Sequence, residues 1–171
     1  ARCMRKTPDS PARGKGALLS ACRKYRYQLQ REWDSKGKTC AFIGLNPSTA
    51  DEINDDPTIR RCVQFAKTWG YGRLVMVNLF AYRCTDPAFL ADLDNPVGKE
   101  NDEHLISACR DADLIVAAWG NYGALLGRDT AVKHLLFELG LKLKCFQLTK
   151  QGRPGHPLFQ PKTATLTDFN G

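Results

Sequence analysis

The chain has none of the motifs by which the common nucleotide-binding enzymes are recognised. There is no G-x-x-x-x-G-K-[ST] segment, and no G-x-G-x-x-G segment opens a helix after a strand. These glycine-rich loops cradle phosphates in phosphate-loop NTPases and in dinucleotide-dependent oxidoreductases, so both enzyme classes are disfavoured. Ser48 is not surrounded by a G-x-S-x-G elbow, so the sequence gives no support for a serine nucleophile.

Long apolar runs and closely paired cysteines are missing as well. No apolar run approaches the roughly 18 residues that a membrane span requires, and the basic start of the chain has no apolar signal core. The seven cysteines include no C-x-x-C pair, which favours reduced core thiols over a zinc or iron–sulfur site. We therefore expect a cytoplasmic protein without a metal, a cofactor or a membrane partner.

Positive charge is concentrated near the start of the chain. The net charge is +7, and residues 1–40 contain eleven Lys or Arg but only three acidic residues. Tyr25, Tyr27 and Trp33 lie among these basic residues, a mixture that is compatible with a phosphate backbone as partner. A solvated strand face explains the pattern equally well. Because residues 1–16 contain two prolines and two glycines, we expect a flexible basic segment there, followed by a single α/β domain over residues 17–171.

Four apolar runs stop abruptly at residues that favour turns, and helical periodicity lies between them. The runs cover residues 40–45, 73–80, 114–119 and 143–148, as is typical of buried strands. The helical segments cover residues 57–70, 98–110 and 124–139, and Asp56 suits the N-cap of the first. This alternation predicts a three-layer α/β/α sandwich with a mostly parallel four-stranded central sheet. Residues 22–33 alternate as a half-exposed antiparallel strand at the sheet edge.

Polar residues follow each of the four predicted strands. Asn46 lies after the first strand and Asn78 near the end of the second, while Trp119 and His156 lie in the turns that follow the third and fourth. In open parallel sheets, ligands bind at the carboxyl ends of the strands. We therefore expect one site that is assembled from four loops.

The order of these turns resembles the uracil-DNA glycosylase superfamily over residues 38–162. Gly44-Leu45-Asn46-Pro47-Ser48 is similar to its Gly-x-Asn-Pro motif, Ala117-Ala118-Trp119-Gly120-Asn121-Tyr122 to its third strand, and His156-Pro157 to its His-Pro motif. Asn78 lies where the superfamily has a base-recognising Asn. The runs Asn-Pro-Ser-Thr-Ala-Asp and Asp-Asp-Pro-Thr-Ile-Arg-Arg-Cys also resemble a bacterial and phage family with no assigned function.

The superfamily resemblance implies hydrolysis of an N-glycosidic bond at a modified or mismatched base. Asn46 would hold a water, and His156 would donate a hydrogen bond to the departing base. Some superfamily members have a water-activating carboxylate at the position of Asn46, so Asp51 is a candidate replacement. The candidates for contact with the base or sugar are Gly44, Pro47, Ser48, Asn78, Phe80, Tyr82, Trp119, Gly120, Asn121 and Pro157. The candidates for contact with phosphate are Arg60, Arg61 and Arg153.

Two other interpretations stay open. The first is a non-catalytic nucleic-acid or nucleotide-binding module that uses the same crevice. The second is Mg²⁺-dependent phosphate chemistry through Asp51, Asp55 and Asp56, although acids at this position more often cap a helix. For both the glycosylase-like enzyme and the binding module, the expected partner is a nucleic acid, a nucleotide or a nucleobase.

Overall fold

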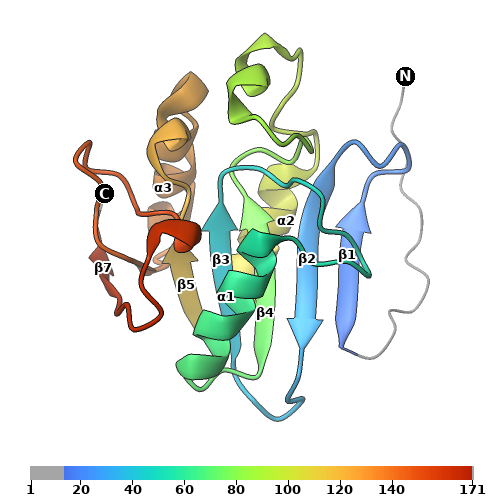
Figure 1. Ribbon diagram of the computed structural model, residues 1–171. Helices are drawn as coiled ribbons and strands as arrows, with labels where there is room; N and C mark the ends of the chain where they lie inside the picture. The colour runs from blue at the N-terminus through green and yellow to red at the C-terminus, as the bar shows by residue number, and fades with distance from the viewer. Residues whose placement is uncertain (1–13, 171) are drawn as a thin grey trace.

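The computed structural model describes residues 14–170, and its centre is one seven-stranded mixed sheet in the order β1-β2-β4-β3-β5-β6-β7 (Figure 1). The strands are β1 (Lys15–Leu19), β2 (Arg26–Glu32), β3 (Thr39–Gly44), β4 (Arg73–Asn78), β5 (Leu114–Ala117), β6 (Leu143–Cys145) and β7 (Thr167–Phe169). The α-helices are α1 (Pro57–Thr68), α2 (Asn101–Asp111) and α3 (Arg128–Glu138). Three shorter 3-10 helices are η1 (Pro87–Asp92), η2 (Asn121–Gly127) and η3 (Pro157–Phe159). The mixed α/β class is therefore confirmed.

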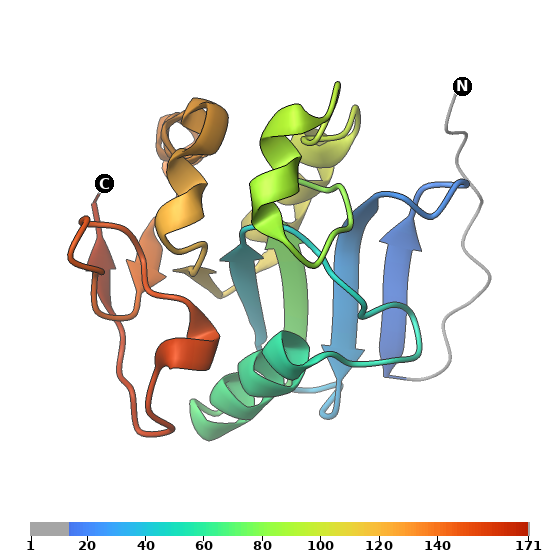
Figure 2. The same cartoon turned by 45° about the horizontal axis from the view of Figure 1, so that its top comes forward.

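The four strands expected from the apolar runs lie side by side and parallel, in the order β4-β3-β5-β6. Gly44 at the end of β3 pairs with Asn78 at the end of β4, and Ile43 pairs with Ala117 at the end of β5. This register brings the carboxyl ends of three strands to the same edge of the sheet. Figure 2 turns that edge forward and shows η1 and η3 beside it.

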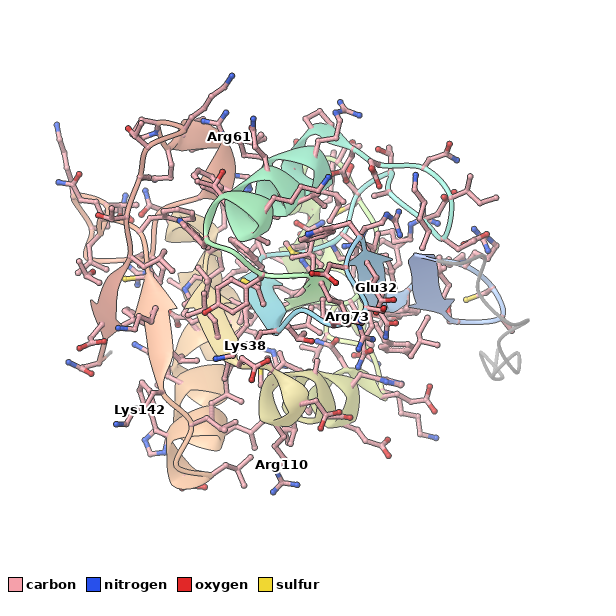
Figure 3. All side chains as sticks on the ribbon, turned by 90° about the horizontal axis from the view of Figure 1, so that it is seen from below. Glu32, Lys38, Arg61, Arg73, Arg110 and Lys142 are labelled. Atoms are coloured by element: carbon pink, nitrogen blue, oxygen red, sulfur yellow. The ribbon has the colours of Figure 1, made fainter. Side chains whose placement is uncertain are left out.

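Helices cover both faces of the sheet. Ile59, Cys62 and Phe65 of α1 belong to one buried cluster with residues of β3 and β4, whereas α2 and α3 contribute to a second cluster. Figure 3 views the sheet from below, with Arg61 of α1 on one side and Arg110 of α2 on the other. As predicted, Asp56 caps α1, because its Oδ1 accepts from the backbone N–H of Ile59 at 2.9 Å.

The amino-terminal part of the sheet differs from the expectation. The predicted strand over residues 22–33 is β2, but it lies between β1 and β4 and is largely buried, so it is not a half-exposed edge strand. The edge strand is β1, which includes Lys15 and Gly16 and thus overlaps the segment predicted to be flexible. The rest of that predicted segment, residues 1–13, lies outside the described residues.

Two smaller corrections concern the remaining strand and helix boundaries. At the opposite edge, β7 pairs antiparallel with β6, a strand that the apolar pattern does not predict. The third helix begins at Arg128 rather than near residue 124, because the preceding segment forms η2, with Leu126 at a positive φ of 54°.

Cys22 is disulfide-bonded, so the expectation of reduced thiols throughout is wrong there, while Cys40, Cys62, Cys84, Cys109 and Cys145 are free.

Within residues 14–170, the helices are all too short or too polar to cross a bilayer.

Candidate functional site

A pocket of about 530 Å³ lies at the carboxyl ends of β3, β4 and β5. Many of the residues expected to form a site line it, namely Gly44, Asn46, Pro47, Ser48, Asn78, Trp119, Gly120, Asn121, His156 and Pro157. The loop after β3, the end of β4, the turn after β5 and η3 therefore meet at one hollow. The position of the pocket follows from the parallel register of the strands.

His156 enters the pocket as the N-cap of η3. Its Nδ1 accepts a hydrogen bond from the backbone N–H of Leu158 at 3.1 Å, which places the ring proton on Nε2. Burial lowers the pKa of His156, against a smaller opposing effect of Asp56, so the ring is neutral near pH 7. Among residues 14–170, no hydrogen-bond partner engages Nε2. His156 is therefore a neutral hydrogen-bond donor at the pocket wall.

Asn46 is fixed by its amide nitrogen. Nδ2 donates to the carbonyl oxygen of Pro47 at 3.0 Å and to that of Cys84 at 2.8 Å. No described residue donates to Oδ1, which leaves an acceptor for a water or a ligand. Cys84 also lines the pocket, but burial raises the pKa of its thiol, so it is not an activated nucleophile.

The pocket lining includes a buried cation that the sequence pattern does not reveal. Arg26 is only 2% exposed, and its Nη1 donates to the carbonyl oxygen of Ala50 at 3.1 Å. Its Nη2 lies 3.4 Å from Oδ1 of Asn78, which orients the Asn78 amide. Burial lowers the pKa of Arg26 to about 10, although the nearby Asp56 opposes this shift, so the side chain is charged at neutral pH.

Two glycines allow the side chains of the pocket to lie close to the backbone. A Cβ at Gly44 would lie 2.6 Å from Cε of Met76 and 2.8 Å from Nδ2 of Asn78. A Cβ at Gly123 would lie 2.1 Å from Cδ1 of Trp119, whose ring is 1% exposed and forms part of the wall. The glycine of the Gly-Leu-Asn-Pro segment is thus required by the close approach of Asn78.

Exposed apolar side chains surround the mouth of the pocket. Tyr122 on η2 is 51% exposed, and Leu158 and Phe159 on η3 are 44% and 85% exposed. Large apolar side chains gathered at a concave site mark a binding surface more often than scattered single ones do. These three residues form the apolar rim.

The acidic residues of the loop before α1 do not converge on a metal. Asp51 accepts hydrogen bonds from the backbone of Ile53 at 2.9 Å and of Asn54 at 2.7 Å, and it does not line the pocket. Burial alone would raise the pKa of Asp51, but these hydrogen bonds outweigh it and lower the pKa. Asp55 pairs with Arg31 at 2.8 Å. Within the described part of the chain, no group of three or more His, Cys, Asp or Glu could hold a metal ion.

Two aromatic candidates lie away from the pocket. Phe80 is completely buried in the core cluster with α2 and α3, so its ring is not available to a ligand. Tyr82 packs edge-on against Tyr25, with ring centroids 5.5 Å apart. Neither residue lines the pocket, because the chain beyond β4 directs both side chains toward the hydrophobic core.

The three arginine candidates for phosphate contact also lie outside the pocket lining. Arg60 donates to the carbonyl oxygen of Asp55 at 3.1 Å, and Arg61 donates to that of Gln160. Arg153 lies 3.5 Å from Asp129 and borders a separate hollow of about 190 Å³. Each is thus engaged with the protein rather than directed at the main pocket.

The fold and the pocket define a mixed α/β protein with a pocket at the carboxyl ends of its parallel strands. Residues 26–158 match the model of a family described as a protein of unknown function (DUF1643), and the chain belongs to that family. The matched segment contains every lining residue of the pocket except Phe159. No curated protein and no solved structure matches the chain. The expectation of a family without an assigned function is confirmed, and the superfamily resemblance stays a prediction.

Replacing Asn46 by Asp tests why an amide occupies this position. A carboxylate cannot donate to the carbonyl oxygens of Pro47 and Cys84, so Asn46→Asp should lose about 1–3 kcal/mol of unfolding free energy at pH 7. Urea denaturation measures this loss. The matched control is Asn121→Asp, because Oδ1 of Asn121 only accepts, from Thr149 at 2.6 Å, and a carboxylate keeps that role. Equal losses in the two variants would contradict the assigned hydrogen bonds.

The ring state of His156 is accessible to long-range ¹H–¹⁵N NMR. We expect the Nε2–H tautomer at pH 7 and a titration midpoint below the ordinary value of 6.5, because protonation would bury a charge and displace the Leu158 N–H. As the pH falls through 6.5, unfolded chains take up this proton before native ones do, so native stability should decrease. Leu158→Ala keeps the backbone donor and should leave the tautomer unchanged. A midpoint above 6.5, or an Nδ1–H tautomer, would be incompatible with this geometry.

Proposed function

We propose that the pocket binds a nucleobase and that the protein hydrolyses its N-glycosidic bond, in a uracil-DNA glycosylase-like three-layer fold. The substrate would be a modified or mismatched base in a nucleic acid, or the base of a nucleotide. One observation carries the proposal. Neutral His156 offers an Nε2–H donor, and Asn46 offers a free Oδ1 acceptor, on the walls of a single hollow.

These two groups suit the two ends of the reaction. When the carbon–nitrogen bond breaks, its electron pair stays on the base, and the negative charge spreads to a carbonyl oxygen. In this proposal, the Nε2–H of His156 stabilises that charge as it develops. Oδ1 of Asn46 accepts a hydrogen bond from the water that adds to the sugar carbon. The proton that this water loses passes to solvent or to the released base, which balances the reaction.

The size and surroundings of the pocket support a base as ligand. A volume of about 530 Å³ lies within the range of roughly 300–1,000 Å³ that is usual for small-molecule sites. Asn78 provides an oriented amide for the polar edge of a base. In the apolar rim, Tyr122 and Phe159 supply aromatic faces against which neighbouring bases can stack, and Leu158 adds aliphatic surface.

A binding module without catalysis is the second candidate, and one observation favours it. Asp56 is the only carboxylate among the described lining residues, and both of its oxygens are engaged. Oδ1 accepts from the backbone of Ile59 at 2.9 Å, and Oδ2 accepts from that of Ala50 at 3.4 Å. The pocket therefore has no free carboxylate to activate water. Such a module would bind the same base and release nothing.

Base release distinguishes the two candidates. The substrates are duplex and single-stranded oligonucleotides that carry uracil or modified pyrimidines, together with free nucleotides. The wild type should release base, and His156→Ala should slow release by about 100- to 1,000-fold, because one preorganised donor to a developing oxyanion is lost. The melting temperature should change little. His134→Ala is the matched control, since the His134 side chain is 76% exposed and lies outside the pocket.

Three outcomes decide between the candidates. Slow release by His156→Ala with an intact fold supports the hydrolase. Salt-sensitive binding by the wild type, without release from any substrate, would make the binding module the correct account. A large fall in melting temperature for His156→Ala would assign His156 a structural role.

A further inference from the structure

The charge state of the ligand follows from Arg26, which the proposed chemistry does not use. Its side chain lines the pocket but is almost entirely removed from water. Among residues 14–170, no carboxylate lies within the 4.0 Å that defines an ion pair with it, and the nearby Asp56, which partly offsets the lowered pKa of Arg26, is itself engaged by the backbone of Ile59 and Ala50. A buried cation without a paired anion is unfavourable unless another group compensates for its charge.

The hydrogen bonds of Arg26 are also incomplete. A guanidinium group has five N–H donors, and the protein engages two of them, with Ala50 and Asn78 as acceptors. The Nε atom is fully buried and has no partner in the described structure. The second bond is long, at 3.4 Å, and therefore weak. Arg26 thus has unused donors next to a cavity.

The other polar groups of the pocket share this imbalance. Nε2 of His156 and Nδ2 of Asn78 are donors without a described acceptor, and Nε1 of Trp119 is buried without a partner. Oδ1 of Asn46 is a free acceptor, and Ser48, Thr58 and Thr85 add hydroxyl groups that can donate or accept. A ligand that supplies several oxygen acceptors would satisfy those unpartnered donors that face the pocket.

We propose that the pocket is selective for an oxyanion, which binds against Arg26. This inference rests on the proposed nucleobase site and specifies its ligand. The ligand is a base that carries a carboxylate or an ionised exocyclic oxygen, or a nucleotide that presents its phosphate. Arg26 provides the positive charge, and Asn78 and His156 provide flanking hydrogen bonds. A neutral base of the same shape leaves the guanidinium without a direct ion pair and binds more weakly.

Isothermal titration calorimetry at pH 7 with matched ligand pairs tests this selectivity. Orotate is paired with 6-methyluracil, and 5-carboxyuracil with thymine, so that a carboxylate replaces a methyl group at two ring positions. For the wild type, the carboxylate of at least one pair should bind about tenfold more tightly or better, as is typical of a charge-assisted hydrogen bond. Uridine monophosphate and inorganic phosphate are the probes for the phosphate source.

Substitution of Arg26 then tests the residue itself. Arg26→Gln should abolish the preference, so that the carboxylate and its methyl counterpart bind with about equal affinity. Arg26→Lys should retain part of the preference because the charge is kept. Arg31→Gln is the matched control, since Arg31 is a buried arginine on the same strand that lies outside the pocket lining. It should preserve the wild-type preference. If Arg26→Gln does not fold, the wild-type ratio still tests the selectivity for an oxyanion, and Arg26→Lys tests the residue.

The outcomes separate this inference from the proposed function. Equal binding of charged and neutral bases by the wild type would overturn the oxyanion site and leave the base site standing. An Arg26-dependent preference for phosphate, without binding of any base, would support the oxyanion site and overturn the base site. Absence of binding by all of these probes would overturn both. A carboxylate preference that persists in Arg26→Gln would assign the selectivity to other residues.

Discussion

The parallel pairing of β3 with β4 and β5 is the constraint on which the pocket depends. Pairing of Gly44 with Asn78 and of Ile43 with Ala117 makes the three strands end together. The loops that follow must then leave the sheet at one edge. The segment after β6 is held to the same edge, because the Gly120 N–H donates to the carbonyl oxygen of Pro154 at 2.9 Å. A shift in this register would separate Asn46 from Asn78 and from the turn at Gly120.

A common pattern of hydrogen bonds gives the pocket its chemistry. His156 uses Nδ1 to accept from the backbone, Asn46 uses Nδ2 to donate to it, and Asn78 receives Arg26 at Oδ1. Each side chain is thus fixed at one polar atom and leaves the other for a ligand. Preorganisation of this kind reduces the reorganisation that binding or catalysis would otherwise require. The glycine at position 44 belongs to the same arrangement, because Asn78 lies against its backbone.

The parallel strands, α1 and part of the pocket wall could be predicted from the sequence, because local patterns specify them. Apolar runs that end near Gly44 and Asn78 indicate strand ends, and Asp56 before Pro57 predicts the start of a helix. Arg26 could not be singled out, since its burial depends on contacts with Ala50 and Asn78 that are distant in sequence. The assignment of Phe80 to the site is wrong because the chain beyond β4 directs its ring into the core. Short antiparallel strands such as β7 carry too few residues for a recognisable pattern.

The central claim is that the hollow between Asn46 and His156 holds a nucleobase. A crystal structure of the protein soaked with orotate and with uridine monophosphate tests it most directly. The account predicts a planar ring in the pocket, with one oxygen about 2.7–3.1 Å from Nε2 of His156 and an anionic group against Arg26. A ligand bound elsewhere, or coordinates in which Asn46, Asn78 and His156 do not share one hollow, would contradict it.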